Sequence, residues 1–167
     1  MRKLPYLLSA LGAALTAMVC ALTVGKKKYA DVQELAIESQ KKGNELKAQF
    51  VDVIDRDTEA FNAVSAVFAM PKDTDEEKAA RKAAMQEALK GCTKTPFEMM
   101  ELACQALELT RSVVGKLNAS AASDLGCAAL SLKAAIQGAW LNVLINIGGI
   151  QDQAFADEYR QKGQALL

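Results

Sequence analysis

The sequence contains no histidine among its 167 residues. This excludes His-based catalytic triads, the usual proton shuttle near neutral pH, and most zinc and iron sites. Acid–base chemistry is therefore left to carboxylates, lysines, tyrosines or cysteines. The four cysteines are far apart and include no Cys-x-x-Cys pair. We expect them to be small buried residues in a reducing compartment, the cytoplasm, with no structural disulfide.

Aromatic residues, proline and glycine are also scarce, whereas half of the residues are apolar and many of these are alanine. This composition predicts an all-α protein, and the length predicts a single domain over residues 1–167. Twenty basic and twenty acidic residues cancel. Because no net field would attract a polyanion, no nucleic-acid partner is expected.

The first apolar run allows two interpretations. A basic start before the run is typical of a secretory signal peptide, in which case the protein is exported and the segment is cleaved. Alternatively, residues 7–24 form a buried helix whose small residues, such as Gly12 and Ala13, let neighbouring helices approach closely. The run is too short and too rich in Ala and Gly for a convincing membrane span, so no membrane partner is expected.

Caps, prolines and glycines predict six helices, over residues 7–24, 29–68, 76–90, 96–114, 123–146 and 152–167. Thr74-Asp75-Glu76-Glu77 is a capping box that begins the third helix. Gly91 is expected to end it, and Thr95-Pro96-Phe97-Glu98 to begin the fourth with a second capping box and proline at the first position. We therefore expect an up-and-down bundle of five to six long packed helices.

One helical stripe contains a carboxylate. The apolar residues between Phe50 and Phe68 recur with a period near 3.6, which predicts a buried face, and Asp57 lies within it. A buried carboxylate costs free energy unless it is paired, hydrogen-bonded or protonated. Asp57 is therefore a candidate acid or base with a raised pKa; alternatively it bonds a cation or a helix end across the core.

The helix over residues 123–146 carries a strip of small residues between Asp124 and the two asparagines Asn142 and Asn146. Such a strip indicates either a tight helix contact or the wall of a pocket. Asp124 and Asn142 would be about 27 Å apart on a straight helix. They therefore cannot serve one small site within one subunit unless the helix breaks.

Several motifs occur together in an order that resembles a known family, the cyclodeaminase/cyclohydrolase family of folate enzymes. These are Gly12-Ala13-Ala14-Leu15, Gly25-Lys26-Lys27-Lys28-Tyr29, Asp55-Arg56-Asp57-Thr58-Glu59-Ala60-Phe61-Asn62, Met70-Pro71-Lys72, Glu76-Glu77-Lys78-Ala79-Ala80-Arg81, Asn118, Ser123-Asp124-Leu125, Gly138-Ala139 and Asn142-Val143-Leu144-Ile145-Asn146. The resemblance covers nearly the whole chain.

The resemblance implies a homodimer or higher oligomer that acts on the one-carbon unit of a tetrahydrofolate-type small molecule. A cyclodeaminase would close 5-formimidoyltetrahydrofolate with loss of ammonia, as in histidine degradation, and a cyclohydrolase would open 5,10-methenyltetrahydrofolate with water. Both are addition–elimination reactions that one positioned carboxylic acid can serve. No metal or other cofactor is implied.

The resemblance also implies roles for individual residues. Asp57 matches the family's proton donor. Asp124, with its neighbour Ser123, and the asparagines Asn142 and Asn146 match polar positions that would bind the pterin ring or order Asp57. Asp124 alternatively caps its helix. Lys27, in the Lys26–Lys28 cluster, would receive the carboxylates of the folate tail, unless the cluster is simply a solvated helix end.

The start of the chain departs from the family pattern. Relatives carry a proline- and glycine-rich loop before the first helix, where this chain has Met1-Arg2-Lys3-Leu4-Pro5-Tyr6. Such a loop presents backbone N–H groups more closely than side-chain-bearing residues do. The alternative function is therefore a catalytically inactive family member that acts as an oligomeric structural or regulatory partner.

Overall fold

The computed structural model describes residues 3–167, and these form an all-helical bundle with no β-strand among them. Met1 and Arg2, the first residues of the segment that departs from the family pattern, lie outside the described residues. The predicted all-α class is confirmed. The elements are α1 (Leu4–Ala21), η1 (Lys27–Val32), α2 (Gln33–Phe68), α3 (Asp75–Val113), η2 (Ala119–Ala121), α4 (Ala122–Ile147) and α5 (Gln153–Ala165).

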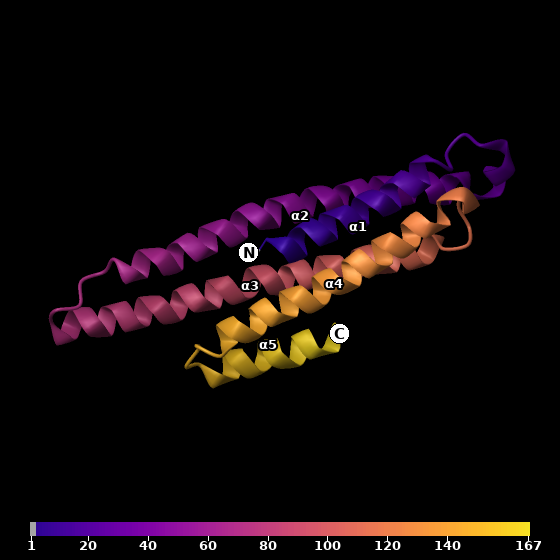
Figure 1. The fold of residues 1–167 in the computed structure, drawn as a ribbon. Coiled ribbons are helices and arrows are strands. Elements are labelled where there is room, and N and C mark those ends of the chain that lie inside the picture. The colour runs from indigo at the N-terminus through magenta and orange to yellow at the C-terminus, as the bar shows by residue number, and fades with distance from the viewer. Residues whose placement is uncertain (1–2) are drawn as a thin grey trace.

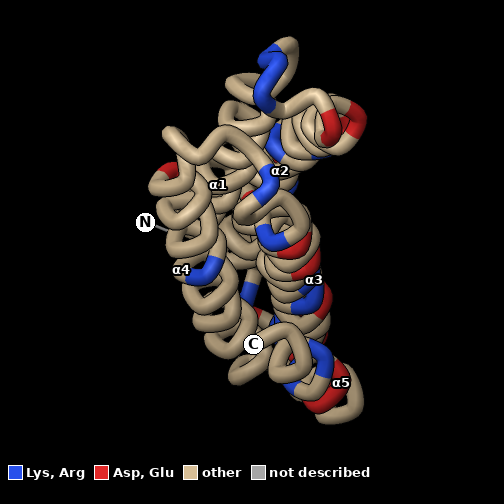
Figure 2. Tube along the Cα trace, turned by 90° about the vertical axis from the view of Figure 1, so that its right-hand side faces the viewer, with Lys and Arg blue, Asp and Glu red and all other residues tan. Residues whose placement is uncertain are grey.

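The four longest helices run up and down in chain order and form an elongated bundle (Figure 1). Each packs against two neighbours, α1 and α3 against both α2 and α4, while α5 folds back along α4 and α3. Charged residues are concentrated along α2, α3 and α5, whereas α1 and α4 are mostly uncharged (Figure 2). The sequence explains this distribution, because α1 contains no charged residue and α4 contains only Asp124 and Lys133.

Close contacts explain why small residues recur in α1. A Cβ atom added at Gly12 would lie 2.6 Å from Cγ of Leu132 in α4, and one at Gly43 in α2 would lie 3.0 Å from Cβ of Ala17. In the structure this segment packs as a core helix, and it begins three residues earlier than predicted. By length and composition alone, α1 and the stretch Ala119–Ile147 are each apolar enough to cross a membrane, a test that core helices and N-terminal signal sequences also pass.

Several predicted helix boundaries are confirmed. The Thr74 side chain accepts a hydrogen bond from the backbone N–H of Glu77, and both halves of that capping box are formed. Asp152 caps α5 by accepting from the N–H of Phe155. Gly115 follows α3 with a φ of 75°, in the left-handed region that favours glycine.

The predicted break between residues 90 and 96 is wrong, because α3 runs without interruption from Asp75 to Val113. Proline in a helix interior removes the N–H that would bond the carbonyl four residues earlier. Here that carbonyl belongs to Cys92, and Nδ2 of Asn146 donates to it at 2.6 Å. A side chain from α4 thus replaces the bond that Pro96 removes, so the helix continues.

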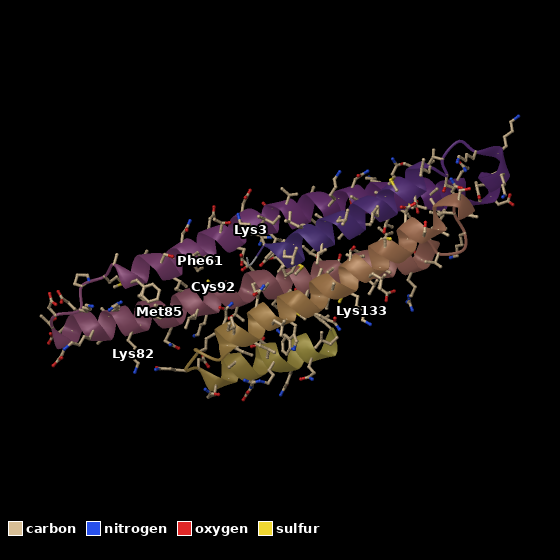
Figure 3. All side chains as sticks on the ribbon, viewed as in Figure 1. Lys3, Phe61, Lys82, Met85, Cys92 and Lys133 are labelled. Carbon is tan, nitrogen blue, oxygen red and sulfur yellow. The ribbon has the colours of Figure 1, made fainter. Side chains whose placement is uncertain are left out.

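The stripe on α2 is buried along only part of its predicted length. Phe50 and Val53 are fully buried, but Phe61 is 45% and Phe68 65% exposed. The reason is that α1 begins beside Asp57, so the last part of α2 extends beyond it, next to the start of α3 (Figure 3). Periodicity identified the inward face of α2, but the covering helix is too short to bury all of it.

The cysteines are free thiols in the structure. Cys20 and Cys92 are buried and Cys104 is half-buried, whereas Cys127 is exposed on the outer side of α4, so the expected burial is wrong for Cys127. Burial raises the pKa of the Cys20 thiol to about 11, which keeps it protonated and unreactive.

Candidate functional site

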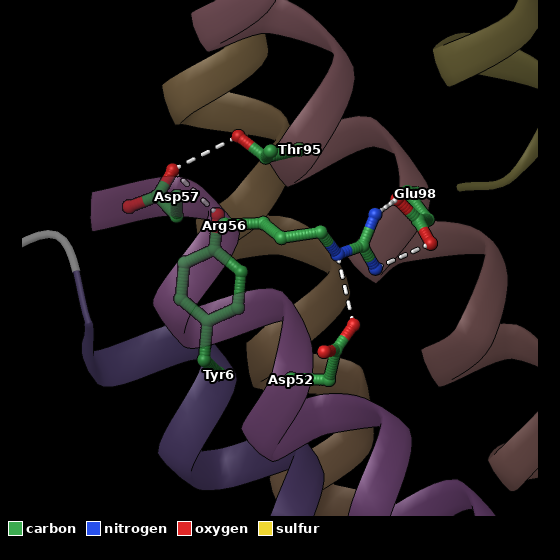
Figure 4. A network of polar contacts seen from close by, with 6 residues as sticks. All are labelled: Tyr6, Asp52, Arg56, Asp57, Thr95 and Glu98. Atoms are coloured by element: carbon green, nitrogen blue, oxygen red, sulfur yellow. Dashed lines mark hydrogen bonds and ion pairs between the residues drawn. The ribbon is translucent and has the colours of Figure 1, made fainter. Parts of the chain in front are cut away.

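The carboxyl group of Asp57 lies at the boundary between the covered and uncovered parts of the bundle. Two hydroxyl groups donate to its Oδ1, that of Tyr6 in α1 at 3.0 Å and that of Thr95 in α3 at 3.0 Å (Figure 4). Tyr6 is 1% and Asp57 9% exposed. These bonds satisfy one oxygen of a buried carboxyl group, as its burial requires. Neither bond uses Oδ2.

Thr95 was assigned by its sequence pattern to a helix cap, and its hydroxyl group instead contacts Asp57 across the bundle. Tyr6 carried no sequence signal, because a tyrosine in an apolar run is expected simply to be buried. The tertiary structure therefore adds two residues, from two further helices, to the candidate site.

An ion-pair network fixes α2 against α3 beside Asp57 (Figure 4). The guanidinium of Arg56 donates to both carboxylate oxygens of Glu98, at 2.6 and 2.8 Å, and its Nε donates to Asp52 at 2.9 Å. Glu98, mainly by these hydrogen bonds, raises the pKa of Arg56. Bidentate pairs of this kind restrict orientation more than single contacts do. Arg56 therefore holds the register of the two helices that carry Asp57 and Thr95.

The two predicted asparagines lie at the same end of α4, towards the start of α1. Asn146 is 5% exposed and its amide donates to the Cys92 carbonyl, so part of its hydrogen-bonding capacity serves α3. Asn142 is half-buried one turn earlier, and Gly138, one further turn back, lies against the ring of Pro5 in α1. The structure therefore places both asparagines towards the Asp57 end of the bundle.

The other predicted binding residues lie at the opposite end. Lys27 is in η1, and Ser123 and Asp124 are in the first turn of α4, next to η2 (Figure 1). The helix from Gln33 to Asp57 alone spans about 36 Å. These three residues cannot contact the same small molecule as Asp57 within one subunit. Asp124 is not the N-cap of its helix, although its first-turn position suits a negative charge.

Beyond Asp57, Phe61 on α2 and Met85 on α3 lie along the part of the hairpin that extends past the start of α1 (Figure 3). Phe61 is 45% exposed, whereas Cys92 is buried at the level where α4 still contacts α3. No group of three or more His, Cys, Asp or Glu residues suited to a metal ion occurs within residues 3–167. The arrangement offers a held carboxyl group beside an apolar surface, which suits proton transfer to or from a bound organic molecule.

Comparison with known proteins gives consistent matches over nearly the whole chain. Residues 7–165 match the family model described as Formiminotransferase-cyclodeaminase. The chain is 42% identical over 158 residues to methenyltetrahydrofolate cyclohydrolase of Methylorubrum extorquens, covering 95% of this chain and 76% of that protein. It is 31% identical over 159 residues to formimidoyltransferase-cyclodeaminase of Sus scrofa, where it spans only 29% of the relative's length.

A solved structure agrees with these matches. The crystal structure of formiminotetrahydrofolate cyclodeaminase from Thermotoga maritima superposes with a TM-score of 0.85 and 25% sequence identity, covering 99% of this chain and 78% of that one. The resemblance indicated by the ordered motifs is therefore confirmed: the chain belongs to the formiminotransferase-cyclodeaminase family.

Proposed function

We propose that this protein is a folate one-carbon enzyme that hydrolyses 5,10-methenyltetrahydrofolate, with Asp57 as its general acid and base. The observation that carries the proposal is the carboxyl group of Asp57, which is held through Oδ1 by two hydroxyl groups while its Oδ2 takes no part in those bonds. The 42% identity to a methenyltetrahydrofolate cyclohydrolase, over 76% of that protein's length, supports this chemistry.

The reaction needs protons moved between water and nitrogen. Water adds to the methenyl carbon, which lies between N5 and N10, and gives up a proton to the Asp57 carboxylate. The bond from this carbon to N5 then breaks, and the carboxylic acid returns the proton to N5. The product is 10-formyltetrahydrofolate, and one proton is released overall. Holding Asp57 through Oδ1 keeps its other oxygen in one orientation for both transfers.

A cyclodeaminase is the second candidate, favoured by the match to formiminotetrahydrofolate cyclodeaminase over 99% of this chain. In that reaction N10 attacks the formimidoyl carbon and ammonia leaves, so the same carboxylic acid would protonate the departing nitrogen. The chain would then act in histidine degradation. Neither reaction requires a metal or other cofactor from this site, and both are consistent with the cytoplasmic location that we propose.

The test follows the absorbance of methenyltetrahydrofolate with purified protein. Wild type should accelerate its decay, and Asp57→Asn should lower kcat about 100- to 10,000-fold, the usual contribution of a general acid or base. Asp55→Asn, an exposed carboxylate on the same helix, is the matched control and should keep full activity. Formation of methenyltetrahydrofolate from 5-formimidoyltetrahydrofolate would establish the cyclodeaminase instead. If wild type accelerates neither the decay of methenyltetrahydrofolate nor its formation from 5-formimidoyltetrahydrofolate, the inactive structural or regulatory partner becomes the better description.

The uncharged surface of α1 and α4 supports a homodimer. Large apolar side chains stand exposed along one stripe of each helix: Leu4, Leu7, Leu11 and Met18 on α1, with Leu22 directly after it, and Leu130, Leu141, Leu144 and Ile145 on α4. Monomeric proteins rarely expose extended apolar patches, whereas dimer interfaces are enriched in them. The α1–α4 surface is the one that we assign to a second copy of the chain.

Sedimentation measurements test this assignment. Leu7→Glu and Ile145→Glu should each shift the protein towards monomer, and Val51→Glu, at an exposed aliphatic residue of α2, should not. Flotation of wild type with anionic lipid vesicles would instead assign the surface to a membrane.

A further inference from the structure

The threonines inside the helices follow a common pattern with one exception. In four of them the hydroxyl group donates to the carbonyl of the residue four positions earlier in the same helix: Thr16, Thr58, Thr93 and Thr110. This local bond is a usual one for a helical threonine. The hydroxyl group of Thr95 instead donates to Oδ1 of Asp57, 38 residues away, at 3.0 Å. Because a hydroxyl group has a single proton, Thr95 makes this bond in place of the local one.

The backbone that carries Thr95 is fixed on both sides. Three residues earlier, the carbonyl of Cys92 accepts from Asn146 of α4 at 2.6 Å. Three residues later, Glu98 accepts both guanidinium bonds of Arg56 from α2. Bonds to two other helices therefore hold the turn of α3 on which the donor is placed. A donor on such a rigid element restricts its acceptor more closely than one on a loop would.

The two donors of Asp57 together determine where its second oxygen points. A single hydrogen bond to Oδ1 would leave the carboxyl group free to pivot about that oxygen. The hydroxyl groups of Tyr6 and Thr95 approach Oδ1 from two different helices, and Figure 4 shows the other oxygen turned away from both.

The second oxygen of Asp57 is also accessible. Oδ2 accepts from no group within residues 3–167. No side-chain oxygen in this part of the chain is both fully buried and unpaired. Oδ2 therefore reaches the molecular surface, where a bound molecule can meet it.

We propose that Thr95 is a positioning residue, whose hydroxyl group directs Oδ2 of Asp57 towards the reacting atoms of the substrate. The inference rests on the proposed function and names a side chain on which its proton transfers depend. Thr95 is only 9% exposed and its proton is engaged by Asp57, so it acts through the carboxyl group and not on the substrate. A misplacement of about 1 Å can cost a reaction about 100-fold, and the loss of one of two donors should cost less.

The experiment compares two variants of Thr95 with a matched control. Thr95→Val replaces the hydroxyl group by a methyl group of similar shape, and Thr95→Ser keeps the hydroxyl group. Thr93→Val is the control, because Thr93 is buried in the same helix and its hydroxyl group bonds the Leu89 carbonyl at 2.9 Å. The constants kcat and KM are measured for whichever of the two folate reactions wild type catalyses, and urea unfolding confirms that each variant is folded in the assay.

We expect Thr95→Val to lower kcat about tenfold and to leave KM within about twofold of wild type. Thr95→Ser should restore most of the lost kcat, and Thr93→Val should match wild type. In an Asp57→Asn background, Thr95→Val should have no further effect on the residual rate, because its effect passes through the carboxyl group.

Three results would overturn the positioning role: a kcat in Thr95→Val equal to that of the control, a raised KM with unchanged kcat, or a loss that Thr95→Ser does not restore. An equal loss in the Asp57→Asn background would also contradict it. In each case, turnover that depends on Asp57 would leave the proposed function intact. If wild type catalyses neither reaction, the proposed function and this inference fail together, and Thr95 only satisfies a buried carboxyl group.

Discussion

The bond between Asn146 and the Cys92 carbonyl leads to a quantitative prediction. Asn146→Leu keeps a similar side-chain volume but removes the amide donor, so the Cys92 carbonyl beside Pro96 loses the hydrogen bond from Asn146. Removing a buried hydrogen-bond donor costs about 1–3 kcal/mol. For a protein of this size each kcal/mol lowers Tm by about 2–4 °C, so we expect Tm to fall by about 2–12 °C.

The assay is urea unfolding at a fixed protein concentration, in wild type and in a Pro96→Ala background. Alanine at position 96 supplies the backbone N–H that proline lacks, and this N–H can bond the same carbonyl. Asn146→Leu should therefore cost at least about 1 kcal/mol less in the Pro96→Ala background, a coupling that a double-mutant cycle measures. Equal costs in the two backgrounds would refute the compensation that we infer for α3.

The same pair separates the structural role of Asn146 from its predicted role in binding the pterin. Pro96→Ala should restore stability to Asn146→Leu but should not restore any affinity for substrate. A KM that stays raised in the double variant would indicate that Asn146 also contacts the substrate. A KM that recovers together with stability would assign the residue to the helix alone.

Three further predictions concern the packing and the site. Gly12→Ala should destabilise the protein by about 1–3 kcal/mol, because the added methyl group meets a leucine of α4. Gly126→Ala, with open space around it, should stabilise the protein by up to about 1 kcal/mol. Urea unfolding measures both changes. Tyr6→Phe should cost about 1.5–3 kcal/mol in the same assay, because the carboxyl group that it contacts loses a donor. Asp152 has a pKa below its usual 3.8, chiefly because a backbone N–H of α5 bonds its carboxylate, so its stabilisation of α5 is present above pH 3.8 and is lost as pH falls below it. The fluorescence of Trp140, which contacts α5, should report this loss, and Asp152→Asn should remove the acid-dependent step.

The all-α class and most helix boundaries were predictable, because they depend on local signals. The capping box at Thr74, the cap at Asp152 and the stop at Gly115 each act within a few residues of the position they mark. Asp57 was also identifiable, since a carboxyl group on an apolar stripe conflicts with burial wherever the stripe packs. These signals required no knowledge of distant contacts.

The errors arose where a distant residue changes the meaning of a local signal. Pro96 with Thr95 and Glu98 is a strong helix-start pattern, but Asn146 compensates the proline, while Thr95 bonds Asp57 and Glu98 binds Arg56. All three pattern residues serve long-range contacts. Local spacing carries no information about partners 38 to 54 residues away.

The predicted set of binding residues was divided between the two ends of the molecule for a related reason. Family motifs give only an order along the chain. In an up-and-down bundle, successive connections between helices lie at alternate ends of the molecule. Lys27 and Asp124 therefore lie at one end, while Asp57 and Asn146 lie towards the other. Only the lengths and directions of the helices reveal which predicted residues can share a ligand.

The difference in helix lengths accounts for the position of the candidate site. The α2 and α3 helices have 36 and 39 residues, whereas α1 has 18 and α4 has 26, so the longer pair must extend beyond the shorter one. A carboxyl group deeper in the bundle would need donors on both oxygens, and one nearer the tip would be solvated and loosely held. At the level of Asp57, hydroxyl groups from α1 and α3 hold one oxygen, and the uncovered hairpin begins just beyond it. A proton-transferring group requires this combination of a fixed orientation and access to a bound molecule, and in this fold the boundary of the covered region provides both.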